Sequence, residues 1–289
     1  MHPATETYAI ARRCFALLIG LGYAVAFAAV WQQCLGLLGA DGLRPMSGVL
    51  QSAAERFGAV KYLHVPTLFW VSSADWALRA VAALGALAGL ALAAGIAARW
   101  AAATAWIAYL SFVASEDPAA QATFFNWPFD LLTVEVGFLL VFLVPGGWRG
   151  DFRRETGVAR IARWLARLLL FRLVLGPGVL KLAVGQDNWA HGDAVRDFLQ
   201  NAPSPTGLAP PVWDGPDAVL RAATWGILVF ELLGPWLLFA RRNYRHTFAL
   251  GCTVFMAVVF ATTNVRGLPI YTSALALLCV DDRAFGRLS

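Results

Sequence analysis

The chain has 289 residues, of which 59% are hydrophobic and only 14% are charged, and its mean hydropathy is +0.61. An average soluble domain carries about 25% charged residues, so this composition excludes a soluble globule, a disordered chain, a coiled coil and a disulfide-rich scaffold. The net charge is 23 − 18 = +5, but only two of the basic residues are lysines, and most arginines lie in short connections beside apolar segments, where they orient membrane helices rather than bind nucleic acid.

Several apolar segments are long enough, or nearly so, to cross a membrane, since a spanning helix needs about 20 mainly apolar residues. They are 14–38, 76–98, 100–115, 124–145, 164–184, 219–240, 247–263 and 267–281. The last two are short and are separated by Asn264-Val265-Arg266-Gly267, so they form either half-spans or a tight helical hairpin. The expected fold is an all-α polytopic bundle of about eight transmembrane helices, within a range of roughly seven to nine.

Basic residues recur in every second connection between these segments. They are Arg12, Arg13, Arg99, Arg149, Arg153, Arg154, Arg160, Arg163, Arg241, Arg242, Arg245, Arg283 and Arg287. With about eight spans they share one side of the membrane, and the positive-inside rule makes that side, with both termini, cytoplasmic. A composition rich in alanine and arginine but poor in lysine is typical of GC-rich bacteria. We therefore expect a bacterial inner membrane rather than the endoplasmic reticulum.

Two long connections, 39–75 and 185–218, fall on the outer side. Long ordered loops are commonly functional, so these form either the cap of a cavity or a plain solvated cover. Residues 1–289 are expected to form a single transmembrane domain without a separate soluble domain.

Ionisable side chains inside spans are costly and are therefore candidates for function. Asp130 and Glu135 lie five positions apart on the fourth span, so about 140° separates them and both can face the bundle interior. Arg172 and Lys181 lie on the fifth span, and Glu231 lies near the middle of the sixth. The expected orientation places Asp130, Glu135 and Lys181 in the outer half of the membrane.

These charges have a structural and a chemical interpretation. In the first they form interhelical ion pairs, Glu135 with Arg172 and Glu231 with Lys181, because charges in lipid must be paired or hydrated. In the second, Lys181 is a desolvated lysine that acts as a general base. It follows Gly176-Pro177-Gly178, which predicts a kink or an unwound turn beside a cavity.

Under the chemical interpretation Lys181 is the base, His191 is a proton relay, and Asp130 and Glu135 tune or relay protons. The residues expected to line the substrate cavity are Arg172, Glu231, Trp189, Trp127 and Asn264. The cysteines have no metal-ligand spacing, so we expect packed thiols and no metal. They are Cys14, Cys34, Cys252 and Cys279.

Several segments in chain order resemble the lipase maturation factor family. Residues 32–45, QQCLGLLGADGLRP, are similar to that family's glycine-rich exit from the first span. Residues 125–139, FNWPFDLLTVEVGFL, resemble its WDxLLLExGFL segment with Pro128 as an extra residue, and residues 230–236, FELLGPW, resemble FIELxxP. The resemblance covers nearly the whole chain. It implies an integral-membrane factor that assists folding, assembly or modification of an exported protein, for example a lipase, with that client and membrane lipids as partners.

A second likeness concerns residues 178–182, GVLKL, with residues 189–192, WAHG, which are similar to a segment of vitamin K-dependent γ-carboxylases. It implies the membrane architecture called HTTM, a quinone as cofactor, and a role for Lys181 in deprotonating a hydroquinone. Residues 262–267 and 197–205 depart from the maturation factor motifs. The family also carries a soluble region after the spans that this sequence does not contain, which leaves the client open. A small transporter or lipid carrier is a further alternative, although the sequence has none of the internal repeats common in transporters.

Overall fold

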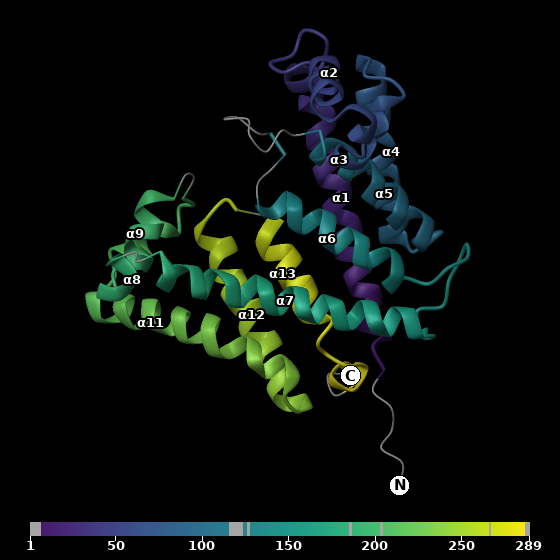
Figure 1. The fold of residues 1–289 in the computed structure, drawn as a ribbon. Helices are drawn as coiled ribbons and strands as arrows, with labels where there is room; N and C mark the ends of the chain where they lie inside the picture. The colour runs from purple at the N-terminus through teal and green to yellow at the C-terminus, as the bar shows by residue number, and fades with distance from the viewer. Residues whose placement is uncertain are drawn as a thin grey trace. The chain divides into compact units, whose positions relative to one another are not determined.

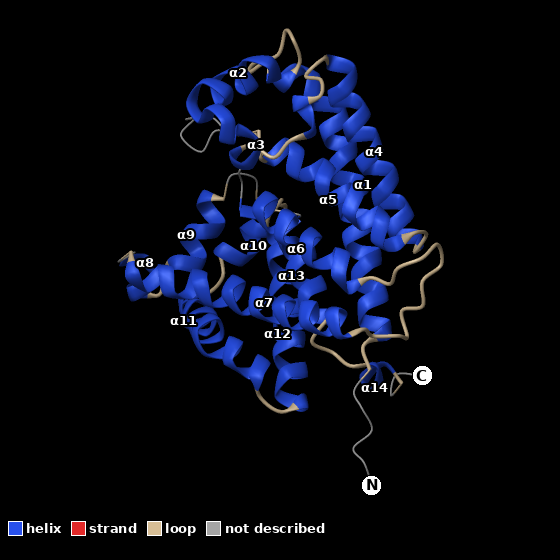
Figure 2. Ribbon diagram, turned by 45° about the vertical axis from the view of Figure 1, so that its right-hand side comes forward, coloured by secondary structure: helices blue, strands red, loops and turns tan. Residues whose placement is uncertain are grey.

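A computed structural model describes residues 7–115, 124–125, 128–184, 187–202, 205–265 and 267–286. Within these ranges the regular structure is helical, and the β interaction that occurs is an isolated bridge between Pro205 and Thr263. Figure 2 shows the same all-helical chain by secondary structure. The expected all-α fold is confirmed. The chain divides into an N-terminal unit, Arg12–Ala162, and a C-terminal unit, Arg163–Ser289 together with Met1–Ala11.

The N-terminal unit combines long apolar helices with a run of short ones (Figure 1). Its elements are α1 (Ala9–Leu38) from Arg12 onward, α2 (Met46–Phe57), η1 (Gly58–Val60), α3 (Lys61–His64), η2 (Leu68–Trp70), α4 (Asp75–Ala94), α5 (Ala98–Val113) and α6 (Pro128–Leu143). Close packing of α1 on α4 depends on glycine, because a Cβ on Gly89 would lie 2.7 Å from the Gly20 carbonyl oxygen and a Cβ on Gly85 would overlap the Phe27 ring. Small residues thus let the two backbones touch, as in many membrane helix pairs.

The C-terminal unit also combines long helices with a run of short ones. Its elements are most of α7 (Gly157–Ala183), then α8 (Asp187–His191), α9 (Ala194–Asn201), α10 (Ala209–Trp213), α11 (Asp217–Leu233), η3 (Gly234–Phe239), α12 (Arg242–Thr262), α13 (Gly267–Leu277) and α14 (Asp282–Phe285). The expected outer connections 39–75 and 185–218 are therefore not plain loops, because each contains several short helices.

Some of the described helices are long and apolar enough to cross a membrane. They are Ala9–Leu38, Asp75–Ala94, Asp217–Phe239 and Arg242–Thr262, with Gly267–Leu277 as a shorter apolar helix. The chain is therefore an α-helical integral membrane protein. The expected spans 100–115 and 124–145 correspond to the 16-residue helices α5 and α6, and the count of about eight spans stays a prediction.

Several expected boundaries need correction. The second span ends at Ala94 rather than residue 98, because Gly95 takes a left-handed conformation with φ of 78° that stops the helix. The fifth and seventh segments begin earlier than expected, at Gly157 and Arg242, since arginines continue both helices beyond their apolar parts. The helix of the last segment ends at Leu277, before residue 281.

Candidate functional site

Lys181 and Glu231 form an ion pair in the C-terminal unit. Lys181 Nζ lies 2.5 Å from Glu231 Oε2 and 2.6 Å from Oε1, and the two side chains are 19% and 6% exposed. Lys181 stands in the last turn of α7, and Glu231 lies on α11. The expected pairing of Glu231 with Lys181 is confirmed, so the structural interpretation accounts for both charges.

Gly178 explains how these two helices approach so closely. A Cβ at this position would lie 2.9 Å from the Glu231 Cβ, which is closer than Cβ contacts normally come. The glycine lies three residues before Lys181, so both share one face of α7. The helix runs unbroken through Pro177, so an unwound turn is wrong, whereas the alternative of a kink stays a prediction. Within the Gly-Pro-Gly sequence, Gly178 provides the point of contact with α11.

The ammonium group of Lys181 also faces an aromatic ring. Its Nζ lies 4.3 Å from the ring centroid of Trp189 on α8, which is a cation–π geometry. The structure thus brings together Lys181, Glu231 and Trp189 from three helices. A carboxylate and the face of an indole ring are both favourable partners for an ammonium group, so the geometry suits Lys181 as a structural cation.

The other residues expected in this region do not belong to that buried group. His191 ends α8 with an exposed side chain, although it is only two residues from Trp189. Arg172 is exposed on α7, and nine residues, or 2.5 turns, place it on the opposite side of the helix from Lys181. Asn264 is exposed just after α12.

Asp130 and Glu135 lie in the N-terminal unit, on α6. Asp130 is buried, as its expected inward orientation requires, and Tyr109 Oη donates to its Oδ1 at 2.5 Å. Tyr109 packs edge-on against Tyr23, whose hydroxyl donates to the Thr133 carbonyl oxygen. Glu135 is half-buried. The expected cavity residue Trp127 lies outside the described residues.

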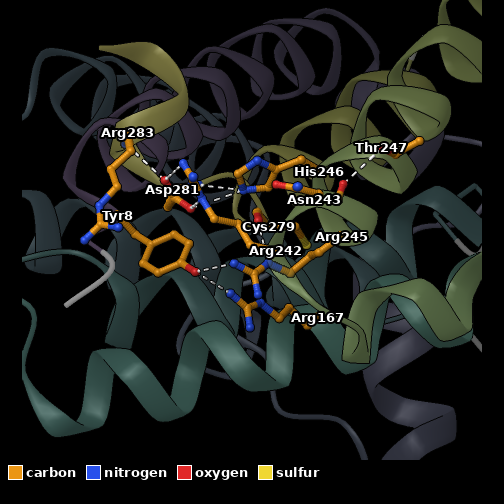
Figure 3. Close-up of polar contacts among 10 residues, drawn as sticks. All are labelled: Tyr8, Arg167, Arg242, Asn243, Arg245, His246, Thr247, Cys279, Asp281 and Arg283. Atoms are coloured by element: carbon orange, nitrogen blue, oxygen red, sulfur yellow. Dashed lines mark hydrogen bonds and ion pairs between the residues drawn. The ribbon is translucent and has the colours of Figure 1, made fainter. Parts of the chain in front are cut away.

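A buried basic cluster surrounds Tyr8 in the C-terminal unit (Figure 3). Arg167 and Arg245 each donate from Nη2 to Tyr8 Oη at 3.0 Å, and the Arg163 guanidinium carbon lies 3.7 Å from the Tyr8 ring centroid. Arg163 and Arg245 were expected in cytoplasmic connections, but both are buried within helices. The helical spacing of Arg160, Arg163 and Arg167 is the sequence signal that could have shown this.

Next to this cluster, Asp281, which follows α13, forms ion pairs and hydrogen bonds with side chains of α12. Arg242 donates to both its carboxylate oxygens, to Oδ1 at 2.6 Å, and His246 Nε2 lies 3.3 Å from Oδ2. Asp281 lies beyond the last apolar helix and is fully buried. Burial raises the pKa of its carboxyl group, but the hydrogen bonds and charge of Arg242, helped by His246, outweigh burial and lower the pKa below its usual range.

Asp282 then caps the first helix. Its carboxylate accepts from the backbone N–H groups of Ala9 and Ile10, each at 2.9 Å, and its own N–H donates to the Thr7 carbonyl oxygen. A carboxylate at a helix N-terminus satisfies free N–H groups and complements the helix dipole. The Tyr8 cluster and the Asp282 contacts together connect residues 7–10 to α7, α12 and residue 282. We call this set of contacts the clamp between the chain ends.

The cysteines pack as expected. Cys34, Cys252 and Cys279 are buried free thiols, and Cys14 is half-buried. Among the residues that the structure describes, no group of three His, Cys, Asp or Glu side chains could hold a metal ion.

These features define the class: an α-helical integral membrane protein with a buried Lys–Glu ion pair and a buried arginine cluster between its helices. Residues 10–287 match the lipase maturation factor transmembrane domain, and the chain belongs to the lipase maturation factor family. This confirms the resemblance inferred from the sequence.

Curated relatives extend this match to named proteins. The chain is 28% identical to lipase maturation factor 1 of Mus musculus over 291 residues, covering 98% of this chain and 50% of the relative. It is 30% identical to lipase maturation factor 1 of Homo sapiens over 164 residues, covering 57% and 28%. It is 29% identical to lipase maturation factor 2 of Gallus gallus over 293 residues, covering 96% and 39%. The chain thus spans half the length, or less, of these relatives. No solved structure matches it.

Proposed function

We propose that this chain is a membrane domain that assists the maturation of an exported lipase. The observation that carries the proposal is the match of nearly the whole chain to one transmembrane domain, in relatives named for lipase maturation. Its partners are then the surrounding lipids and an exported protein client that the membrane domain meets on its outer side.

In this proposal the Lys181–Glu231 pair holds α7 against α11 and so supports the outer segment formed by α8, α9 and α10. The pair is joined to that segment directly, since Trp189 of α8 stacks on Lys181. Arg196 of α9 extends the link, because it donates to the carbonyl oxygens of Trp213 and Gly215. A client that contacts this segment would depend on the pair without reacting with it.

The orientation and the host membrane are part of the same proposal. The arginine-rich connections support cytoplasmic termini, and the composition, with its two lysines, supports a bacterial inner membrane. The named relatives come from vertebrates. Fusing a reporter that is active only in the cytoplasm after residue 286, or into the 39–75 segment, tests the orientation: the first fusion should be active and the second inactive.

The function is tested by deleting the gene from its host and measuring secreted lipase activity per amount of secreted lipase. We expect a loss of specific activity that the wild-type gene restores. The Glu231→Leu variant should restore less than the wild type, whereas Arg172→Met, which removes an exposed charge on α7, should restore fully. Unchanged lipase activity and an unchanged secreted-protein profile in the deletion strain would reject the proposal.

Chemistry at Lys181 predicts a different result in a separate measurement. A quinol-dependent base would require a quinone that co-purifies with the wild type and is lost in Lys181→Met. Mass spectrometry of an organic extract of both proteins distinguishes the two, and we expect the same bulk phospholipid in each. A quinone found only in the wild type would favour the enzyme.

A further inference from the structure

The segment between α2 and α4 exposes an unusual number of apolar side chains. Leu63 is 82% exposed and Val71 is 90% exposed, and Val60, Tyr62 and Leu68 are exposed beside them. All belong to residues 58–71, which we call the turn segment. A soluble surface rarely carries so many large apolar side chains together, so such a patch marks contact with a membrane or with another protein.

The helix that precedes the turn segment has the opposite character. The buried side chains of α2 are Met46, Leu50 and Ala53, which share one face. Its exposed positions are polar or small: Ser47, Gly48, Gln51, Ser52, Glu55 and Arg56. Figures 1 and 2 both show α2 and α3 at the end of the N-terminal unit where α1 stops and α4 starts. One part of this end is therefore polar and the adjoining part apolar.

A cation and two aromatic rings lie within the turn segment. Lys61 Nζ lies 4.6 Å from the ring centroid of Trp70 and 5.1 Å from that of Tyr62, and the two rings pack edge to face. Lysine, tyrosine and tryptophan each have an apolar body and a polar tip, and they concentrate where lipid headgroups meet acyl chains. This group therefore fits the boundary between water and hydrocarbon.

The patch also continues into the lipid-facing surface of the same unit. Trp76, the second residue of α4, is 68% exposed and lies five residues after Val71. Further along that helix Leu84, Leu87 and Leu90 are exposed on an apolar span. This continuity favours lipid over a protein partner, because a spanning helix must present its exposed leucines to the bilayer.

We propose that the turn segment lies in the membrane interface, with Leu63 and Val71 dipping toward the acyl chains and α2 above them in water. Lys61 contacts phospholipid phosphates while its stem and the rings of Tyr62 and Trp70 rest among the headgroups. The partner is the phospholipid of the leaflet at which α1 ends. This binding does not depend on the function proposed above.

Spin labels placed on single cysteines test the placement. The variants are Leu63→Cys, Val71→Cys and, as the matched control on the polar face of α2, Gln51→Cys. The full chain is reconstituted into vesicles of phosphatidylethanolamine and phosphatidylglycerol. The unsubstituted chain, labelled in parallel, gives the background from its native thiols, three of which are buried. Collisions with oxygen, which concentrates in lipid, are compared with collisions with a water-soluble nickel chelate.

We expect labels at 63 and 71 to collide several-fold more with oxygen than with the chelate, and the label at 51 to show the reverse. Equal access of the chelate to all three positions would mean a solvated cover and would overturn the proposal. Protection of 63 and 71 from both reagents would mean that protein covers the patch, and would overturn it as well. Because all three side chains are exposed, unchanged thermal midpoints should confirm that the variants fold.

Discussion

Breaking the Lys181–Glu231 pair is the perturbation with the clearest expected cost. The charged atoms lie 2.5 Å apart, and the side chains are only 19% and 6% exposed. Removing one partner of a buried ion pair costs about 3–5 kcal/mol, because the remaining charge stays buried without a counter-ion. Since Lys181 retains some access to its surroundings, we expect Lys181→Met to lie near about 3 kcal/mol, the lower end of that range.

A double-mutant cycle separates this pair from general damage to the fold. A loss of 1 kcal/mol in the free energy of unfolding lowers the thermal unfolding midpoint by about 2–4 °C in proteins of this size. Lys181→Met should therefore lower that midpoint by roughly 6–12 °C. The Lys181→Met/Glu231→Leu double variant should lose less than the two single variants added together. Replacing both charges by apolar side chains leaves no unpaired charge behind.

Thermal unfolding in lipid nanodiscs, followed by tryptophan fluorescence, measures each midpoint. Arg172→Met is the control, because it removes an exposed positive charge from the same helix. We expect it to shift the midpoint far less than Lys181→Met. A Lys181→Met midpoint equal to that of the wild type, or additive losses in the double variant, would refute the reasoning.

Three further changes probe other contacts by the same unfolding measurement. Gly178→Ala should destabilise by about 1–3 kcal/mol, because its Cβ would overlap α11, whereas Gly176→Ala, with nothing within 4 Å, should be neutral or stabilising. Tyr8→Phe should cost about 1–3 kcal/mol, because two buried guanidinium groups lose their shared acceptor. The pKa of Asp281 is lower in the folded state than in the unfolded state, so its ionised form stabilises the fold above about pH 4. This stabilisation is lost as the pH falls through the folded-state pKa. Asp281→Asn should therefore lower the midpoint at neutral pH and weaken its dependence on pH in acid.

Each of these has an outcome that would contradict it. Equal effects of alanine at 176 and 178 would mean that the approach of α7 to α11 is not limited by the missing Cβ. An unchanged midpoint in Tyr8→Phe would mean that other groups satisfy the arginines. If the unfolding midpoint of Asp281→Asn fell with decreasing pH as steeply as that of the wild type, carboxyl groups other than Asp281 would cause the pH dependence.

Composition and apolar length were enough to predict the helical fold and the positions of most apolar helices. The pairing of Lys181 with Glu231 was also predictable, because a charge in lipid needs a partner. The Tyr8 cluster was not predictable, because the positive-inside rule assigns arginines to the connections between spans. It takes no account of arginines that lie within a helix and point into the protein. In the second outer connection, α8 and α10 were missed because five-residue helices leave too little periodicity to recognise.

The clamp between the chain ends has a consequence for synthesis. The backbone N–H group of Ala9 donates to the carboxylate of Asp282, which lies 273 residues later in the chain. At translation rates of about 5–20 residues per second, the first helix waits roughly 14–55 s before this acceptor has been made. The N-terminal end of α1 is therefore made long before its capping carboxylate, and water or headgroups must serve its amides until Asp282 has been synthesised. This contact can form only after every residue between Ala9 and Asp282 is in place, so it distinguishes a chain made through residue 282 from any shorter intermediate of synthesis.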